Sequence, residues 1–278
     1  MSVSKQAKDR GEILDEIMRY HRAQLPKVMR GVPLSDLRAL CSIASDPVDF
    51  VAALRHKGVG LIAECKKASP SRGLMVPNYD AAQLATQYAR AGASAISVLT
   101  DGRHFQGSLE DLRDVREAMD AHANGRNVPV LRKDFIFHEY HIYEARAAGA
   151  DAVLLIGAVL GAADMAALLQ VTHELGMNAL VEVHTREELE KVLPLKPRVV
   201  GINNRNLQTF EVDFENTARL RKLIPEDLVV VAESGIKSGE DVQRMADIGV
   251  DAILVGESLV RSKDPFAATK ELVRAGRA

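Results

Sequence analysis

Eight short apolar runs, each followed by a helical pattern, constrain the fold of this chain more than any other feature of its sequence. The runs are Gly60–Cys65, Ala95–Leu99, Val128–Leu131, Ala152–Ile156, Ala179–Val183, Val199–Ile202, Leu228–Ala232 and Ala252–Val255. The patterns between them predict helices at Tyr79–Ala91, Ser108–Ala121, Glu139–Ala148, Ala162–Leu175, Arg186–Leu193, Phe214–Leu223 and Ser238–Ile248. Strands apolar enough to be buried on both faces, alternating with helices, predict an α/β fold with a closed parallel (β/α)8 TIM barrel over residues 58–278.

An open, doubly wound parallel sheet is the alternative arrangement for alternating strands and helices. Such a sheet usually carries a glycine-rich nucleotide-binding fingerprint after its first strand. Here the first strand is followed by Lys-Lys-Ala-Ser-Pro at residues 66–70, which favours the barrel. Glycines close three of the predicted helices, at Gly92, Gly149 and Gly249, and fit the short turns that lead from a helix into a strand.

Residues 1–57 precede the first strand and predict a helical extension packed on the barrel, so that the chain forms a single domain overall. Apolar residues recur at helical spacing over Gly11–Leu25, and we expect Pro26 and Gly31-Val-Pro33 to break this helix. A second helix is expected to start at Ser35-Asp36 and a third at Asp46-Pro47. The extension has too small a potential core to fold alone.

The composition excludes several classes of protein. With 278 residues, 47% of them hydrophobic, the chain can bury one sizeable core, and its net charge of -2 gives no sign of a nucleic-acid or membrane partner. It has no apolar run of membrane-spanning length and no recognisable signal peptide, so we expect a cytoplasmic location. The two cysteines, Cys41 and Cys65, predict no disulfide scaffold, and no metal or cofactor site is expected.

Polar residues follow most of the apolar runs, at the end of the barrel where active sites of this fold lie. Glu64 and Lys66 end the first run, and because side chains alternate along a strand, both point to the same side. The same spacing of two separates Lys133 from Phe135, Glu182 from His184 and Asn203 from Arg205. Each pair alone fits a structural ion pair or a solvated strand end, but ionisable residues on six of eight strands predict one shared site.

The last two strands carry a second signal. Ser234-Gly235 and Gly256-Glu257 place backbone N–H groups just before short helical segments. Such groups bind anions, and the loops after strands seven and eight are the usual phosphate site of this fold. We therefore predict a phosphorylated small molecule as the partner. The loop Lys67–Val76 contains Ser, Pro, Gly and Arg72, and we expect it to close over the substrate as a lid.

Six phrases, in the same order, resemble the indole-3-glycerol-phosphate synthase family of tryptophan biosynthesis. The first, Ile62-Ala-Glu-Cys-Lys-Lys-Ala-Ser-Pro-Ser71, is highly specific. The others begin at Leu99, Leu131, Leu180, Gly201 and Ala232. The resemblance covers nearly the whole chain. It implies a carbon–carbon lyase that converts 1-(2-carboxyphenylamino)-1-deoxyribulose 5-phosphate to indole-3-glycerol phosphate, with release of carbon dioxide and water.

The resemblance also implies roles for individual side chains. Lys133 is expected to be the general acid, with a pKa lowered by burial and nearby cations, and Glu182 the carboxylate that balances positive charge and takes up a ring proton. Glu64 would hold Lys66 and Lys133 in place, and Asn203 completes the catalytic set. Substrate-binding roles fall on Ser69, Phe105, Phe135, Arg205, Leu207 and Glu233. Phosphate-binding roles fall on Ser234, Gly235, Gly256 and Glu257.

Two rival interpretations stay open at this point, and the resemblance does not settle which side chain moves each proton. An isomerase of phosphoribosyl compounds on the same barrel would be expected to use a Cys/Asp or Asp/Asp pair, whereas this rim offers two lysines and three glutamates. A barrel that binds a metabolite without turnover would be expected to have lost part of the acid–base set, which is intact here. The oligomeric state is not determined by the sequence, and a monomer is favoured.

Overall fold

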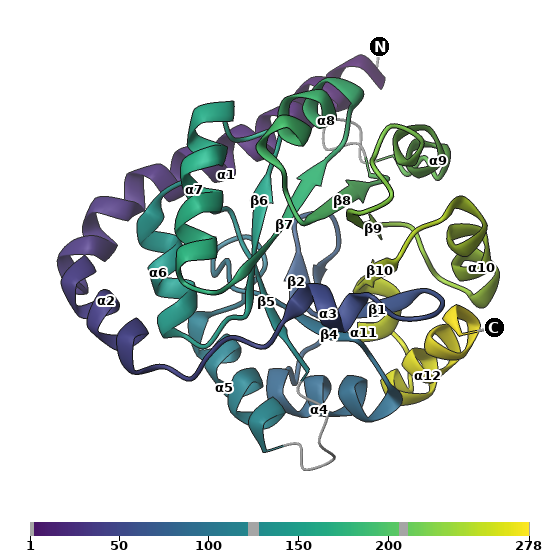
Figure 1. Ribbon diagram of the computed structural model, residues 1–278, viewed down its shortest axis with the longest axis horizontal. Coiled ribbons are helices and arrows are strands. Elements are labelled where there is room, and N and C mark those ends of the chain that lie inside the picture. The colour runs from purple at the N-terminus through teal and green to yellow at the C-terminus, as the bar shows by residue number, and fades with distance from the viewer. Residues whose placement is uncertain (1–2, 122–127, 206–210, 278) are drawn as a thin grey trace.

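The computed structural model describes residues 3–121, 128–205 and 211–277, in which eight parallel strands close into a barrel (Figure 1). Neighbouring strands follow chain order, and the last pairs with the first. The strands are β1 (Gly60–Cys65), β4 (Ala95–Leu99), β5 (Val130–Lys133), β6 (Ala152–Ile156), β7 (Asn178–Val183), β8 (Val199–Asn203), β9 (Val229–Glu233) and β10 (Ala252–Val255). The predicted TIM barrel is confirmed, and an open sheet is excluded because no strand of the barrel has a free edge.

Helices follow the strands and cover the outside of the barrel (Figure 1). They are α4 (Ala81–Ala91), α5 (Leu109–Asp120), α6 (Glu139–Ala147), α7 (Ala162–Glu174), α8 (Arg186–Val192), α9 (Glu215–Arg221), α10 (Gly239–Ile248), the short α11 (Glu257–Val260) and α12 (Pro265–Gly276). A short 3₁₀ turn, Leu193–Leu195, follows α8. Gly92, Gly149 and Gly249 adopt φ values of 104°, 90° and 81° after α4, α6 and α10, which only glycine reaches without strain.

Alternation along each strand divides the core into two layers. Residues such as Ile62, Leu131 and Leu180 point into the barrel, where they form one buried apolar cluster. Their neighbours in sequence, such as Leu61 and Val181, point outward and pack beneath the helices in a second cluster. Because both faces of every strand are buried, the runs are continuously apolar, as the sequence indicated.

Four strands extend differently from the predicted runs. β5 begins and ends two residues later than predicted, β7 begins one residue earlier, β8 ends one residue later, and β9 is displaced by one residue. The extra terminal residues Lys133, Asn203 and Glu233 are polar, which is why the apolar pattern stopped short of them. They remain in the strand because their side chains point into the cavity at the mouth of the barrel.

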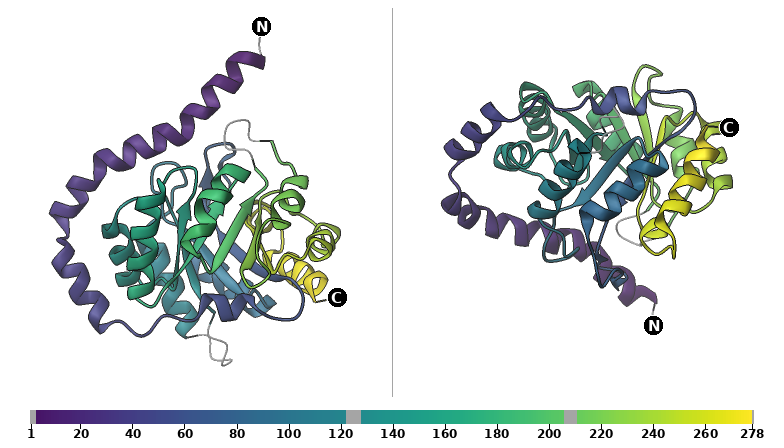
Figure 2. Two further views of the ribbon diagram at one scale, coloured as in Figure 1. Left: turned by 45° about the horizontal axis from the view of Figure 1, so that its top comes forward. Right: turned by 90° about the horizontal axis from the view of Figure 1, so that it is seen from below.

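The N-terminal region contains three helices, α1 (Val3–Gly31), α2 (Leu34–Ile43) and α3 (Phe50–Leu54). The prediction that Pro26 breaks the first helix was wrong, since α1 continues through it, and the helix ends at Gly31, where the second predicted break begins. Proline removes one N–H donor, but more than five turns precede it, so the cost of nucleation has already been met. Figure 2 shows α1 running along the side of the barrel, and its N-terminal half lies at the end where the strands finish.

The expected third helix begins later than predicted, because a tertiary contact holds the preceding residues extended. The backbone N–H of Val48 donates to Asp151 Oδ1 at 2.9 Å. Asp49 then caps α3 by accepting from the Ala52 N–H at 3.0 Å. Phe50 and Leu54 of α3 are fully buried in the apolar cluster inside the barrel. This short helix therefore contributes side chains directly to the interior of the barrel.

The extension also contacts α6, whose Tyr140 Oη donates to the Val32 carbonyl at 2.9 Å. The segment after β1 contains a two-stranded antiparallel hairpin, β2 (Ala68–Ser69) and β3 (Gly73–Leu74), where the sequence indicated only a loop.

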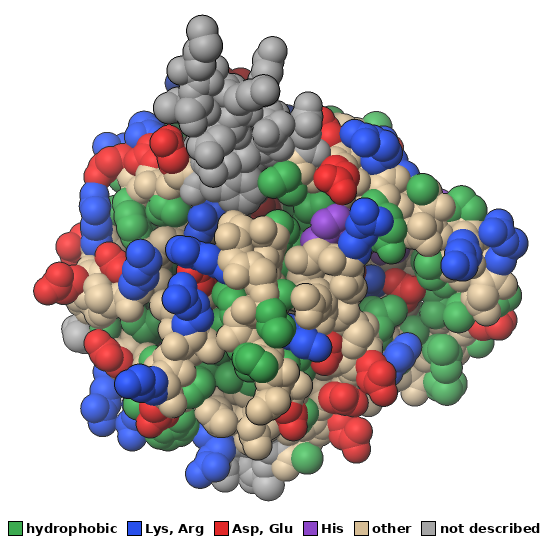
Figure 3. Space-filling model, turned by 180° about the vertical axis from the view of Figure 1, so that it is seen from behind, with side chains coloured by type: hydrophobic (Ala, Val, Ile, Leu, Met, Phe, Trp, Pro, Cys, Tyr) green, Lys and Arg blue, Asp and Glu red, His purple; other side chains and the backbone are tan. Residues whose placement is uncertain are grey.

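Acidic and basic side chains are interspersed over the face shown in Figure 3. Among the described residues, no helix is both long and apolar enough to cross a membrane.

Candidate active site

A cavity of about 600 Å³ opens at the carboxyl ends of the barrel strands. Fourteen of the fifteen residues that the sequence assigned to catalysis, substrate or phosphate line this cavity. The fifteenth, Leu207, lies outside the residues that the structure describes. The convergence follows from strand parity, because residues that continue the inward-facing positions of each strand reach the cavity from all sides.

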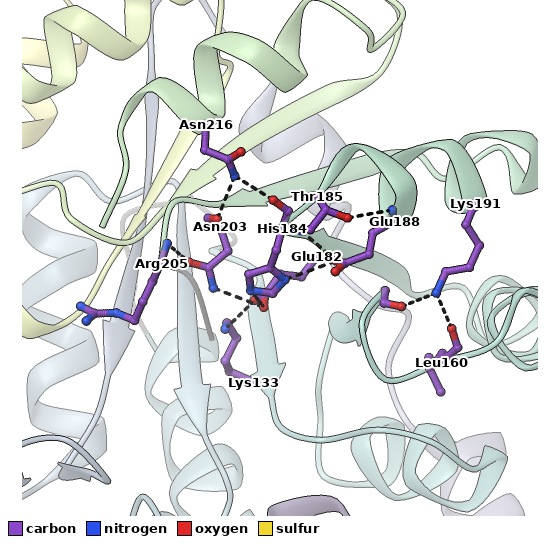
Figure 4. A network of polar contacts seen from close by, with 11 residues as sticks. Lys133, Leu160, Glu182, His184, Thr185, Glu188, Lys191, Asn203, Arg205 and Asn216 are labelled. Atoms are coloured by element: carbon purple, nitrogen blue, oxygen red, sulfur yellow. Dashed lines mark hydrogen bonds and ion pairs between the residues drawn. The ribbon is translucent and has the colours of Figure 1, made fainter. Parts of the chain in front are cut away.

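Lys133 lies among carboxylates on the inner wall of the barrel. Its Nζ is 3.2 Å from Glu182 Oε2 and 3.5 Å from Glu233 Oε2. Figure 4 shows the Lys133 and Glu182 side chains meeting across the barrel from β5 and β7. Both glutamates are almost fully buried. Buried charges of opposite sign compensate for each other's lost hydration, so none of the three is easily replaced alone.

The prediction of a lowered pKa for Lys133 was wrong for the site without substrate. Burial does oppose the charged ammonium, but the negative charges of Glu182, Glu233 and Glu64 outweigh it and raise the pKa of Lys133. Lys133 is therefore protonated at neutral pH, as a proton donor must be before it acts. Proton release has to be driven by the bound substrate, which changes the charge around the ammonium.

The two carboxylates beside Lys133 differ in their protonation. Burial raises the pKa of Glu182, but Lys133 and His184 more than offset this and lower it. For Glu233, burial and the negative charge of Glu182 raise the pKa to about 8, and Lys133 opposes this increase. Glu233 Oε1 also has no hydrogen-bond partner among the described residues. The site thus combines an ionised carboxylate with one that can hold a proton at neutral pH.

The second oxygen of Glu182 faces β8 and the residue after β7. Asn203 Nδ2 donates to Glu182 Oε1 at 3.3 Å, and His184 Nε2 lies 3.3 Å from the same oxygen (Figure 4). Asn203 Oδ1 in turn accepts from the backbone N–H of Arg205 at 3.0 Å. Glu182 therefore accepts hydrogen bonds from Lys133 on one oxygen and from Asn203 on the other, whereas His184 Nε2 has no hydrogen-bond partner among the described residues and acts on Glu182 through its charge.

Glu64 and Lys66 form their own ion pair on the β1 side of the cavity. Lys66 Nζ is 2.6 Å from Glu64 Oε1, and both side chains are largely buried. Glu64 was also expected to hold Lys133, but it acts on Lys133 through its charge, whereas Glu182 and Glu233 make the ion-pair contacts.

The end of the cavity near β4 and β5 is apolar and aromatic. The ring centroids of Phe105 and Phe135 are 6.3 Å apart. Ile13, Leu14 and Ile17 of α1 line the same cavity. The sequence identified these three as the apolar face of a helix, but not as part of the site. Only the path of α1 brings residues so far from β5 in sequence to this rim.

A buried carboxylate joins α1 to the loop after β4. Asp101 Oδ2 is 2.6 Å from His21 Nε2 and 3.0 Å from His104 Nδ1. Its Oδ1 accepts from the backbone N–H groups of His104 and Phe105. Burial opposes the charged form of Asp101, but hydrogen bonds from the two histidines prevail and lower its pKa. We name His21, Asp101 and His104 the helix clamp.

The helix clamp is the one group of described residues with a donor set that could hold a metal ion, since its three ligand atoms lie within 4.8 Å of one another. Ligands of a tetrahedral zinc ion would be roughly 3.3 Å apart, given Zn–N distances of about 2.0 Å. The separations of 2.6 and 3.0 Å are instead those of hydrogen bonds. We therefore interpret the clamp as a hydrogen-bonded group, for which the sequence gave no signal.

The opposite end of the cavity, beside β9 and β10, is built from tight turns. Ser234 and Gly235 adopt φ values of 69° and 89°, and a Cβ on Gly235 would lie 2.4 Å from a methyl carbon of Val212. Glu257 Oε1 is engaged by Arg72 Nε at 2.9 Å and by Arg261 at 3.3 Å. Its carboxylate is thus neutralised by two cations, of which the sequence had indicated only Arg72.

Comparison with known proteins places the chain in a family. The sequence model of a family described as indole-3-glycerol phosphate synthase matches residues 14–272. Indole-3-glycerol phosphate synthase of Dehalococcoides mccartyi strain 195 is 47% identical over 262 residues, which cover 94% of this chain and all of the relative. The enzyme of the same name from Mycobacterium ulcerans is 46% identical over 264 residues, or 95% of this chain and 94% of the relative.

The chain belongs to the indole-3-glycerol phosphate synthase family. The resemblance noted from six sequence phrases is confirmed. Solved structures outside the family agree on the fold alone. 3-Hexulose-6-phosphate synthase from Salmonella typhimurium superimposes with a TM-score of 0.62 at 13% identity, over 78% of this chain and 98% of that one. Thiamine phosphate pyrophosphorylase from Pyrococcus furiosus gives a TM-score of 0.60 at 15% identity, over 79% and 96%.

For this member of the indole-3-glycerol phosphate synthase family, the structure adds residues that the sequence did not assign to the site. For His184, the sequence gave one indication, which is its spacing of two residues from Glu182. Arg261 and Lys237 line the cavity beside the turns at Ser234 and Gly256, and neither had a signal. Surface cations are frequent, and only the closed barrel shows which of them face the cavity.

Proposed function

We propose that the chain closes the indole ring of 1-(2-carboxyphenylamino)-1-deoxyribulose 5-phosphate and releases carbon dioxide and water, as expected for its family. The observation that carries this proposal is the Lys133 ammonium held between Glu182 and Glu233 in the cavity at the mouth of the barrel. A protonated amine beside one ionised carboxylate and one carboxyl with a raised pKa supplies the acid and the base that ring closure needs.

The two ends of the cavity suit the two ends of the substrate. The phosphate would bind at the turns after β9 and β10, through backbone N–H groups of Ser234, Gly235, Gly256 and Glu257. The aromatic ring would lie between Phe105 and Phe135, against Ile13 and Ile17 of α1, with Ser69 at the rim. This orientation brings the ketone of the ribulose chain toward Lys133, because its side chain extends from β5, at the aromatic end, to within 3.5 Å of Glu233 on β9, at the other end.

Lys133 would protonate the ketone oxygen while the ring carbon that bears the carboxylate attacks the carbonyl carbon. Loss of carbon dioxide then returns the bonding electrons to the ring. The resulting hydroxyl leaves as water after protonation, and a carboxylate removes the last proton to give the indole. Glu182 is placed to balance the positive charge on the ring, and Glu233 to return a proton to Lys133. General acid–base catalysis of this kind contributes about 10²- to 10⁴-fold in rate.

The remaining polar residues would hold the substrate in a compact, reactive shape. Lys66, paired with Glu64, would meet the substrate carboxylate. Asn203 would orient Glu182, and Arg205 would meet substrate oxygens. No cofactor is invoked in this scheme. The monomeric state and the cytoplasmic location inferred from the sequence stay predictions.

The test is the fluorescence of indole-3-glycerol phosphate formed from the synthetic substrate, for the wild type and Lys133→Ala together. We expect the wild type to turn over and the variant to lose on the order of 100-fold or more in kcat, because no other ammonium of the described residues lies in ion-pair contact with both carboxylates. The variant should still bind the substrate through the phosphate turns. A wild type that binds but forms no indole would leave only a metabolite-binding barrel.

A further inference from the structure

His184 has no role in the reaction scheme above, yet it is tied into the site from several sides. It follows β7 directly, and its side chain is only 9% exposed. Its Nε2 lies 3.3 Å from Glu182 Oε1, and its Nδ1 lies 3.4 Å from Glu188 Oε2 on α8. The imidazole is thus hydrogen-bonded to a carboxylate on the outer helix, and its other nitrogen lies within ion-pair distance of a cavity carboxylate without a hydrogen-bond partner among the described residues (Figure 4).

The backbone of His184 is fixed as firmly as its ring. Its N–H donates to Glu188 Oε2 at 2.8 Å. Its carbonyl accepts from Asn216 Nδ2 at 3.0 Å, and the same amide lies 3.3 Å from the Asn203 carbonyl. Thr185, the next residue, caps α8 through the Glu188 N–H. These contacts leave the imidazole little freedom to turn away from Glu182.

We propose that His184 is a positioning residue, whose firmly held imidazole places a positive charge beside Glu182 Oε1 and keeps that carboxylate ionised during the reaction. The inference rests on the proposed role of Glu182. Lys133 contacts Oε2 of Glu182, whereas His184 and Asn203 contact Oε1. When Lys133 gives its proton to the substrate, Glu182 loses the charge beside Oε2, and the imidazolium beside Oε1 remains.

The charges around His184 support this role. The titratable groups that face it are Glu182 of β7, Glu188 of α8 and Lys133 of β5; the neighbouring side chains of β8 and α9, Asn203 and Asn216, are neutral amides. Burial opposes the imidazolium, but the hydrogen bond to Glu188 and the charges of Glu182 and Glu188 prevail, and they raise the pKa of His184. A charged imidazole in turn contributes to the lowered pKa of Glu182.

The consequence concerns where the catalytic proton resides. Lys133 Nζ and Glu182 Oε2 are 3.2 Å apart, so a proton can pass between them. A carboxylate with a low pKa does not take that proton, which stays on Lys133 for the substrate. Without His184, Glu182 would become a stronger base and would compete with the substrate for it.

The experiment compares kcat and KM across pH for the wild type, His184→Gln and the control His173→Gln. His173 lies on α7 and does not line the cavity. We expect His184→Gln to lower kcat by roughly tenfold with KM within about threefold. Its acidic limb in kcat should move to higher pH by on the order of one unit, since Glu182 must be ionised and loses a neighbouring positive charge. His173→Gln should match the wild type.

A lower kcat with an unmoved acidic limb would assign His184 a merely structural role and overturn the proposal, as would a profile identical to the wild type. If His184→Gln does not fold, Glu188→Gln keeps the imidazole but removes its outer partner, and it should move the limb in the same direction by a smaller amount. An unmoved limb in a folded Glu188→Gln would also overturn the proposal. An inactive wild type would instead refute the proposed function, so the two failures can be told apart.

Discussion

Two glycines of the barrel wall determine how closely the buried carboxylates can approach it. A Cβ on Gly201 would lie 2.3 Å from Glu233 Oε1, and a Cβ on Gly256 would lie 2.2 Å from Glu64 Oε1. Neither glycine has a positive φ, so the requirement is for space and not for an unusual backbone conformation. At the scale of single residues, the site therefore requires glycine at these two positions in addition to its polar side chains.

Gly201→Ala should displace Glu233 from Lys133 and thereby lower kcat. We expect a loss of roughly tenfold or more in kcat and a cost of about 1–3 kcal/mol in the free energy of unfolding, because the new methyl overpacks a buried site. Steady-state kinetics and chemical denaturation would measure the two effects. Gly161→Ala is the control, since its Cβ would lie 3.6 Å from the nearest atom. Unchanged kcat in Gly201→Ala would contradict the prediction.

Glu233 should make the stability of the fold depend on pH. Burial raises its pKa to about 8 from an ordinary value of 4.5, so the folded state binds its proton more tightly than the unfolded state. The stabilisation from this tighter proton binding is fully present below pH 4.5 and is lost as the pH rises to 8. The free energy of unfolding falls over this range by at most about 1.4 kcal/mol per pH unit.

Glu233→Gln cannot lose this proton, so its free energy of unfolding should fall less than that of the wild type between pH 5 and 8. Denaturant unfolding at several pH values would measure the difference. Glu226→Gln, at an exposed loop position, serves as the control. Parallel curves for Glu233→Gln and the wild type would show that Glu233 is ionised in the folded state.

At the scale of elements, α1 is the part of the chain whose position matters most for the site. It contributes apolar side chains to the cavity, and the helix clamp joins it to the loop that carries Phe105. The clamp is largely buried, with Asp101 fully so, whereas the nearby Arg103–Glu16 pair is exposed at 3.7 Å. Exposed pairs contribute only about 0–1 kcal/mol, so the clamp is the stronger attachment.

His21→Ala should loosen α1 and weaken the apolar end of the cavity. We expect KM to rise several-fold, on the order of 1 kcal/mol in binding, with a smaller change in kcat. Protease cleavage within α1 should also become faster. The control Arg103→Ala removes an exposed ion pair to the same helix, and it should leave KM unchanged. Equal effects of the two substitutions would argue against a special role of the clamp.

At the scale of the whole molecule, stability and catalysis are separated along the barrel axis. The interior holds an apolar cluster that includes Phe50 and Leu54 of α3, and the charged residues lie at the carboxyl ends of the strands. Phe50 is fully buried, and no residue of α3 lines the active-site cavity.

Phe50→Ala should therefore destabilise the fold without changing the chemistry. We expect a loss of about 3–5 kcal/mol in the free energy of unfolding, from lost burial and the cavity left behind. Each kcal/mol corresponds to roughly 2–4 °C in Tm for a chain of this size. Calorimetry would measure Tm, and kinetics at 25 °C should give kcat within about twofold of the wild type. If the folded variant also lost kcat, the packing of the apolar interior and the catalytic end of the barrel would be coupled.

The sequence determined the barrel and the inner ring of polar residues. Both follow from local rules, since strand and helix patterns are periodic and residues two apart, such as Glu64 and Lys66, share one side of a strand. The same rule indicated His184 and Glu182. It also explains why the predicted ends of β5, β8 and β9 were too early. The polar residues Lys133, Asn203 and Glu233 resemble residues beyond a strand, but they belong to the strands and face the cavity.

Only the tertiary structure decided what depends on contacts between distant segments. The path of α1 past Pro26, the meeting of His21 with Asp101 and the filling of the barrel interior by Phe50 join residues that no local pattern links. The protonation states of the site residues also depend on contacts between segments that are distant in sequence. Burial alone would lower the pKa of Lys133, and it is the closure of β5, β7 and β9 into one ring that brings carboxylates close enough to raise it.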